Sequence, residues 1–172
     1  MRRLTFLISL TILSFTAVQA EPAGVPPAPN GIEFPADYPD WRVISVSHRV
    51  DNHSMRAILG NDIAVAAARK GQTNPWPDGT VLGKVVWKEK EKPAWQTAIV
   101  PDKFIHAEFM FKDAKRWAGN GTGWGFARWV GSEYKPYGED AGFSQECIAC
   151  HTPVKGNDWV FTEPAAFPGV LD

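Results

Sequence analysis

One short motif in this chain combines residue types and spacing that could do chemistry: Cys147-Ile148-Ala149-Cys150-His151. Two thiols three positions apart on a helical turn can reach both vinyl groups of a haem, and the histidine that follows is placed to bind the iron. The motif therefore predicts one haem c, attached covalently through Cys147 and Cys150, with His151 as the metal ligand.

The same cysteine pair has competing interpretations. A disulfide or redox pair would also have two cysteines at this spacing, but no thioredoxin-like βαβ pattern precedes the motif. A zinc site would need two more ligands, and the remaining histidines, His48, His53 and His106, form no second paired cluster. Haem attachment is therefore the favoured interpretation.

The second axial ligand decides whether a haem carries electrons or reacts with small molecules, because a carrier has both axial positions filled. Five residues are candidates for that ligand: Met55, Met110, His48, His53 and His106. None of them is followed by a short Pro/Gly-rich context that would single it out. We therefore expect an open distal site.

The composition excludes two classes of protein. The chain has 172 residues, of which 22% are charged and 44% hydrophobic, and its formal net charge is −1. These values are typical neither of a disordered tail nor of a basic nucleic-acid binder, so we expect no nucleic-acid partner. Aromatic residues are 12% of the chain, which suits a packed core or the lining of a large flat cofactor.

The first twenty residues have the pattern of a secretory signal peptide. Arg2 and Arg3 precede an apolar run, residues 4–18, and Val18-Gln19-Ala20 is a small-residue cleavage site. The apolar run is shorter than the roughly 20 residues that a membrane-spanning helix needs. We therefore expect a signal peptide at residues 1–20, a periplasmic location, and no membrane contact after cleavage.

The pattern of strands and helices expected around the motif predicts an α+β fold, which is mainly an antiparallel β-sheet with a few helices. The haem is expected to be attached near the C-terminus. A proline-rich arm is expected at residues 21–33 and a single haem domain at residues 34–172. Helices are expected at residues 63–70 and near the cysteines. Strands are expected at residues 42–50, 54–59, 80–87, 95–100, 104–112 and 126–130.

The late position of the motif is informative, because most small c-type cytochromes are helical and carry CxxCH near the N-terminus. Here a β-rich stretch of about a hundred residues precedes it. This order, together with four shorter features, resembles the cytochrome P-460 family, which includes the cytochromes c′-beta. These features are Tyr38-Pro39-Asp40-Trp41-Arg42, Ile58-Leu59-Gly60-Asn61-Asp62, Pro77-Asp78-Gly79-Thr80 and Lys84. The resemblance spans roughly residues 38–161.

The resemblance implies roles for individual residues. Cys147 and Cys150 match the haem-attaching cysteines and His151 the proximal ligand. Lys84 matches the lysine that the P-460 enzymes cross-link to a meso carbon of the haem. Glu108 falls where the family has a distal carboxylate.

Arg56 matches a nearby arginine of the family, although a surface position is the default for this residue type. Within a haem pocket it could stabilise a propionate or a developing anion.

Strand alternation gives two alternatives for each of the two ionisable residues. Lys84 points to the same side of the strand as Leu82 and Val86. Either its amine is buried and neutral, or its aliphatic chain covers apolar surface while its ammonium stays in water. Glu108 shares a face with Phe104, His106 and Met110, and is either solvated or part of a pocket between two covered faces. The resemblance favours the pocket.

By resemblance, the first hypothesis is an enzyme that oxidises hydroxylamine to nitrous oxide or nitric oxide. Its catalytic residues would be Lys84, Glu108 and Arg56, and Glu108 would be a base whose pKa desolvation raises. The resemblance also implies a homodimer and a redox partner cytochrome.

The alternative hypotheses are a non-catalytic protein of the cytochrome c′-beta kind, which binds nitric oxide or carbon monoxide, and a simple electron carrier. A gas-binding site would have an apolar cap, which Phe104, Phe109 and Phe126 could supply.

Overall fold

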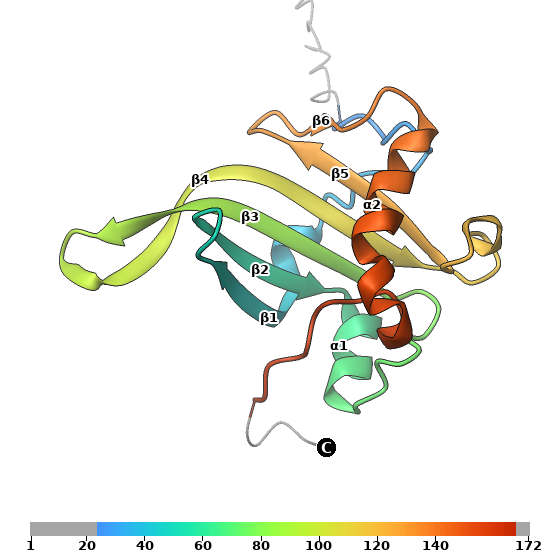
Figure 1. Cartoon of the computed structure of the whole chain (residues 1–172), viewed down its shortest axis with the longest axis horizontal. Helices are drawn as coiled ribbons and strands as arrows, with labels where there is room; N and C mark the ends of the chain where they lie inside the picture. Colours follow the sequence, from blue (N-terminus) through green and yellow to red (C-terminus); the bar gives the residue numbers. More distant parts are fainter. Residues whose placement is uncertain (1–23, 168–172) are drawn as a thin grey trace, which may run out of the picture.

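The computed structural model describes residues 24–167, so the expected signal peptide at residues 1–20 lies outside the described residues. A six-stranded sheet with the order β1-β2-β3-β4-β5-β6 forms the centre of the fold, and all neighbouring strands are antiparallel (Figure 1). The strands are β1 (Arg42–Arg49), β2 (Ser54–Gly60), β3 (Val81–Lys92), β4 (Trp95–Lys112), β5 (Trp124–Val130) and β6 (Lys135–Pro136). The α+β fold with a mainly antiparallel sheet is thus confirmed.

Two α-helices and four short 3-10 helices complete the described structure. They are α1 (Asp62–Arg69), α2 (Ser144–His151), η1 (Tyr38–Asp40), η2 (Ala118–Asn120), η3 (Ala141–Phe143) and η4 (Thr152–Asn157). Helix α1 begins where Asn61 accepts the Ala64 N–H at 3.0 Å, and the same amide oxygen accepts the Val81 N–H at 3.1 Å. Asn61 therefore joins the start of α1 to the start of β3. No helix among residues 24–167 is long and apolar enough to cross a membrane.

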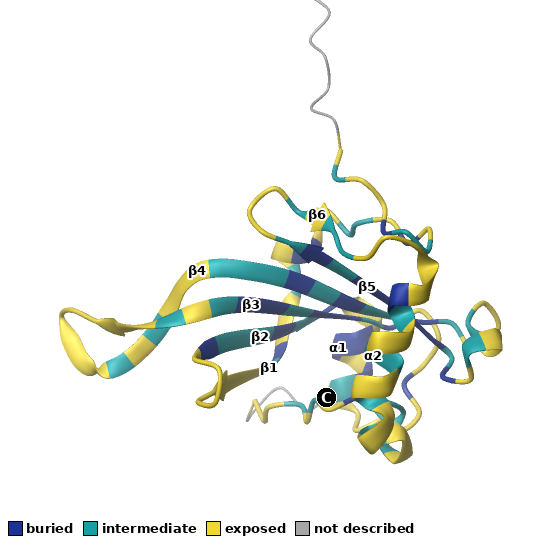
Figure 2. Ribbon diagram, turned by 45° about the horizontal axis from the view of Figure 1, so that its top comes forward, coloured by how far each residue is buried: buried dark blue, intermediate teal, exposed yellow. Residues whose placement is uncertain are grey.

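Both faces of the sheet are covered, and Figure 2 shows the buried residues concentrated in the central strands. One face packs against α1, α2 and the segment that follows η4, around a core that includes Trp76, Trp124 and Val160. The other face packs against the N-terminal arm, whose Ala28 and Ile32 are buried there. A cavity on one face of the sheet is therefore enclosed by the sheet and by the elements that cover that face.

The N-terminal arm, described from residue 24 onward, is held to the sheet by specific contacts. The indole N–H of Trp129 donates to the Pro26 carbonyl at 2.9 Å, and the hydroxyls of Tyr38 and Tyr134 lie 2.7 Å apart. The proline-rich segment therefore contributes to the core of the domain.

Strand β4 is a single strand, whereas the sequence predicted two strands separated near Pro101. Its first half pairs with β3 in a long hairpin that extends beyond the rest of the sheet (Figure 1). Pro101 is opposite Glu89 in this hairpin, where the register is irregular and β4 has no partner on its other side among the described residues. A missing N–H is tolerated at such a position.

A bulge in β4 changes the predicted face of one aromatic residue. Val86 pairs with His106 and Trp87 with Phe104, so Ile105 is an extra residue without a partner on β3. Phe104 therefore lies on the side opposite to Glu108 and packs with Tyr134 at 5.4 Å between ring centroids. The prediction that Phe104 shares a face with Glu108 is wrong for this reason.

Candidate haem site

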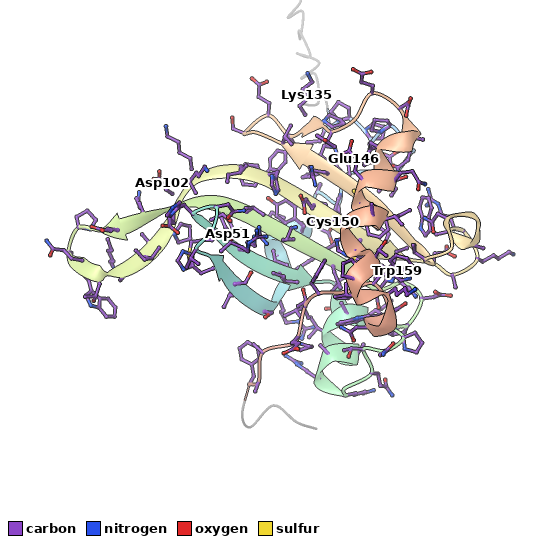
Figure 3. All side chains as sticks on the ribbon, viewed as in Figure 1. Asp51, Asp102, Lys135, Glu146, Cys150 and Trp159 are labelled. Carbon is purple, nitrogen blue, oxygen red and sulfur yellow. The ribbon has the colours of Figure 1, made fainter. Side chains whose placement is uncertain are left out.

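A cavity of about 810 Å³ lies between the sheet and α2. Cys147, Cys150 and His151 of α2 line it, and so do Lys84 of β3 and Glu108 of β4. Figure 3 shows α2 with Glu146 and Cys150 labelled, followed by Trp159 in the segment after the helix. All three residues of the predicted attachment motif therefore face one cavity together with two of the predicted catalytic residues.

The helix α2 gives the two cysteines a common face, because residues three apart on a helix are neighbours. Both thiols are free. Burial raises the pKa of the Cys147 thiol, while Cys150 is exposed. Two free thiols on one helical turn are what attachment to two haem vinyl groups requires.

The side chain of His151 is oriented by a hydrogen bond from its far ring nitrogen. Its Nδ1 lies 2.7 Å from the Trp159 carbonyl, which can only accept, so Nδ1 carries the proton and Nε2 the lone pair. Burial lowers the pKa of His151, although the bond to Trp159 opposes this effect. Phe126 and Phe161 pack edge-on against the ring, at centroid distances of 5.4 and 5.1 Å. His151 is therefore a neutral, fixed imidazole, the form that binds iron.

A row of charged side chains crosses three strands on the cavity wall. Lys84 of β3 is the register partner of Glu108 of β4, which is in turn the partner of Arg128 of β5. The Lys84 ammonium forms an ion pair with Glu108 Oε2, and Arg128 Nε lies 2.8 Å from Oε1. His106 Nε2 lies 3.2 Å from Oε1 as well. One carboxylate, 18% exposed, thus contacts three basic side chains.

The electrostatics of Glu108 differ from the sequence-based expectation. Burial alone would raise its pKa, as expected, but Lys84, Arg128 and His106 together outweigh burial and hold the pKa of Glu108 below its usual range. The expectation of a raised pKa is therefore wrong for this state of the protein, because alternation along one strand does not reveal the cations of the neighbouring strands.

The third predicted catalytic residue, Arg56 of β2, also lines the cavity. Val86 separates it from His106 in the register of the sheet. Its Nε is buried without a hydrogen-bond partner in the described part of the chain, and burial lowers the pKa of its guanidinium. Arg56 therefore presents an unsatisfied donor beside the cavity rather than at the solvated surface.

Of the five candidate sixth ligands, Met110 alone lines the cavity. His48 and His53 both contact the carboxylate of Glu89 at the far end of β1 and β2, outside the cavity, and His106 contacts Glu108. Met110 is the register partner of Leu82 and Phe126, and it packs beside the apolar core.

The residues around the cavity suit a haem in three respects. The thiols and the imidazole that would hold it stand on one helix, as described above. Leu82, Met110 and Phe126 supply apolar surface for a large flat ring. Arg56 has a buried Nε without a hydrogen-bond partner among residues 24–167, and such a donor suits a carboxylate like a haem propionate.

Two parts of the site were not found from the sequence. Arg128 was missed, although its alternation with Phe126 along β5 places both on one face. The segment after η4 contributes Val160, Phe161 and Thr162 to the cavity. Its Ala165 N–H donates to the Ile44 carbonyl of β1 at 2.8 Å, which no sequence pattern indicates.

Comparison with known proteins agrees with this site. A search of the curated proteins found no match. A scan against protein-family models matches Cytochrome P460 over residues 35–162, a range that includes every strand, α2 and the haem-attachment motif. The match covers more than half of the chain, and the chain therefore belongs to the cytochrome P460 family, whose members are c-type haem proteins.

Proposed function

We propose that this protein is a periplasmic mono-haem c-type cytochrome that oxidises hydroxylamine to nitrous oxide or nitric oxide. The observation that carries the proposal is the contact between Lys84 and Glu108 on the wall of the cavity that Cys147, Cys150 and His151 also line. A bound haem would supply an iron centre that takes up the electrons of the oxidation. The periplasmic location rests on the signal-peptide pattern of residues 1–20.

Each residue that would hold the haem has a distinct role. Cys147 and Cys150 form the two thioether bonds, and His151 offers the Nε2 lone pair to the iron. Lys84 is the proposed site of a third covalent bond, in which a bond from its Nζ to a meso carbon would replace an N–H and the meso C–H, with two protons and two electrons lost to an external oxidant. These four side chains come from β3 and α2, which lie on opposite sides of the cavity.

Glu108 is the proposed acceptor of protons that hydroxylamine releases. Paired with the Lys84 ammonium it is ionised but a weak base, because the ion pair lowers its pKa. A nitrogen bonded to an aromatic carbon is a poor base, so a cross-linked Lys84 carries no charge near neutral pH. Loss of that charge raises the pKa of Glu108 and makes the carboxylate a better base. The cross-link and the proton acceptor are thus coupled.

The test combines a spectrum with a mass measurement. Purified protein, oxidised and reduced, is examined by absorption spectroscopy, and its tryptic haem peptides are identified by mass. We expect a strongly red-shifted reduced Soret band and a Lys84 peptide that travels with the haem, both of which Lys84→Leu removes. An ordinary high-spin c-haem spectrum with the CIACH peptide alone would contradict the cross-link.

A second candidate function is non-catalytic binding of nitric oxide or carbon monoxide, and one observation favours it. Lys84 forms an ion pair with Glu108, and an ammonium in such a pair has no lone pair with which to attack carbon. Of the three phenylalanines expected to supply an apolar cap, Phe104 packs in the aromatic cluster of the opposite face, Phe109 belongs to that cluster and also borders the cavity, and Phe126 packs edge-on against His151. Tight binding of either gas without hydroxylamine turnover would support this function.

An electron carrier is the third candidate, and it depends on Met110 as the sixth ligand. A low-spin spectrum in both oxidation states that Met110→Leu converts to high spin would support it. An unchanged spectrum in this variant would show that Met110 is not the sixth ligand, which agrees with the open distal position of the proposed enzyme.

We also propose a homodimer and a redox partner cytochrome. The hairpin of β3 and β4 offers a surface for a second copy, because Trp95 and Ile99 are exposed there. Sedimentation at micromolar concentration should give twice the mass of the processed, haem-bearing monomer, and Trp95→Ser should shift it toward the monomer. A monomer in the unmutated protein would contradict the proposal.

A further inference from the structure

A buried ion pair lies where β4 ends. Lys112, the last residue of β4, has its Nζ 2.7 Å from Asp158 Oδ1, and the two side chains are 8% and 9% exposed. The same ammonium lies 5.0 Å from the centre of the Trp124 ring. Neither residue lines the haem cavity, so the proposed reaction does not account for them.

Asp158 is fixed by more than this ion pair. Its second carboxylate oxygen accepts the Trp76 N–H at 2.9 Å, and its backbone carbonyl accepts the indole N–H of Trp124 at 2.8 Å. Asp158 therefore contacts β4, β5 and the loop before β3, each of which is more than 30 residues away from it in the sequence.

The position of Asp158 in the chain connects this ion pair with His151. Asp158 and Trp159 both have left-handed backbones, with φ of 47° and 65°. Non-glycine residues hold this conformation only where the surroundings impose it. In this conformation the Trp159 carbonyl points to His151 Nδ1, 2.7 Å away. The contacts of Asp158 therefore hold the acceptor that orients the imidazole.

We propose that Lys112 and Asp158 are positioning residues for His151. They hold the Trp159 carbonyl against Nδ1–H, and this hydrogen bond fixes the tautomer and raises the basicity of Nε2 toward the iron. A more basic ligand stabilises the ferric state, so the ion pair lowers the midpoint potential of the haem. The inference rests on the proposed function in one respect, the binding of iron by His151.

The test measures the midpoint potential and the iron–histidine stretching frequency of the ferrous, haem-loaded protein. Asp158→Ala and Lys112→Met should both raise the potential and lower the stretching frequency, because either change releases the Trp159 carbonyl. A purely electrostatic effect would move the potential in opposite directions, since one variant removes a negative and the other a positive charge. The shared direction is thus the diagnostic result.

A matched control comes from the other end of the sheet. Lys90 and Asp102 form an ion pair of 2.9 Å on the β3–β4 hairpin, away from the cavity. Lys90→Met and Asp102→Ala should leave both the potential and the stretching frequency unchanged.

Two milder variants keep the test informative if Asp158→Ala does not fold. Asp158→Asn keeps an acceptor for the Trp76 N–H and should shift the potential less than Asp158→Ala does. Lys112→Arg keeps the cation and should have the same potential as the unmutated protein. Opposite shifts, or none, in haem-loaded variants would overturn this inference alone. Unmutated protein without covalent haem would overturn the proposed function and this inference with it.

Discussion

Lys84 and Glu108 are register partners on β3 and β4, and their side chains form an ion pair on the wall of the haem cavity. The pair joins the proposed cross-linking amine to the proposed base. Lys84 is one of the cations that lower the pKa of Glu108, so a change to Lys84 alters the electrostatics of the base, and the two should be studied together.

Replacement of Glu108 by glutamine should slow hydroxylamine turnover and leave hydroxylamine binding nearly unchanged. A positioned base contributes about 10²- to 10⁴-fold to a rate, so we expect a loss of at least about 100-fold in kcat. Steady-state kinetics and a spectroscopic binding titration measure the two quantities. Glu89→Gln, whose carboxylate contacts His48 and His53 outside the cavity, is the control and should keep full turnover. Equal kcat in Glu108→Gln and the unmutated protein would remove Glu108 from the reaction.

The ion pairs of Glu108 should make the stability of the protein pH-dependent in acid. Its folded-state pKa lies below the ordinary value of 4.5, so its contribution is present above about pH 4.5 and is lost as the pH falls through the folded value. Urea unfolding of the protein before haem attachment, at neutral pH and at lower pH, measures this loss. In Glu108→Gln the decrease between the two pH values should be smaller, and an identical decrease would show that other carboxylates are responsible.

The close packing at Gly83 should make this position intolerant of a methyl group. A Cβ there would lie 2.8 Å from the ring of Phe109, which is almost fully buried. Gly83→Ala should lower the free energy of unfolding by roughly 1–3 kcal/mol, the usual cost of overpacking a core. Gly119→Ala is the matched variant, since nothing lies within 4 Å of its added methyl, and its effect should stay within about 0.5 kcal/mol. Denaturant titration compares the two, and equal effects would contradict the packing described.

The N-terminal arm should contribute measurably to stability. Ile32 is 4% exposed, so Ile32→Ala should lower the free energy of unfolding by about 2–5 kcal/mol, the range for large-to-small core changes. Val46→Ala on the exposed side of β1 is the comparison, because Val46 is 67% exposed, and we expect about 0.5 kcal/mol or less. An equally small decrease in the free energy of unfolding in both variants would mean that the arm is not part of the core in solution.

Local sequence patterns predicted the elements well, because each depends on neighbouring residues. The strands expected at residues 42–50 and 54–59 correspond to β1 and β2, and the helix expected at residues 63–70 corresponds to α1 (Asp62–Arg69). The irregular features were not predictable in this way. The bulge at Ile105 and the continuity of β4 through Pro101 depend on which residues stand opposite on β3.

The haem-attachment residues could be predicted for the same reason, since Cys147, Cys150 and His151 are adjacent in the chain. The charged row could be predicted only in part. Lys84 and Glu108 were identified by resemblance, but their contact with each other and with Arg128 depends on the register of three strands. The tie between Lys112 and Asp158 joins residues 46 positions apart and has no local signature.

The connectivity of the sheet keeps the strands of the cavity wall adjacent in the chain. Each strand from β1 to β5 pairs with its neighbour in the chain, so the sheet assembles from contacts that are close in sequence. A polypeptide made from its N-terminus contains Lys84, Glu108 and Arg128 before Cys147 and Cys150 are synthesised. The wall that carries the charges is thus encoded before the helix that carries the haem ligands, and the segment that closes the cavity beside His151 is encoded after both.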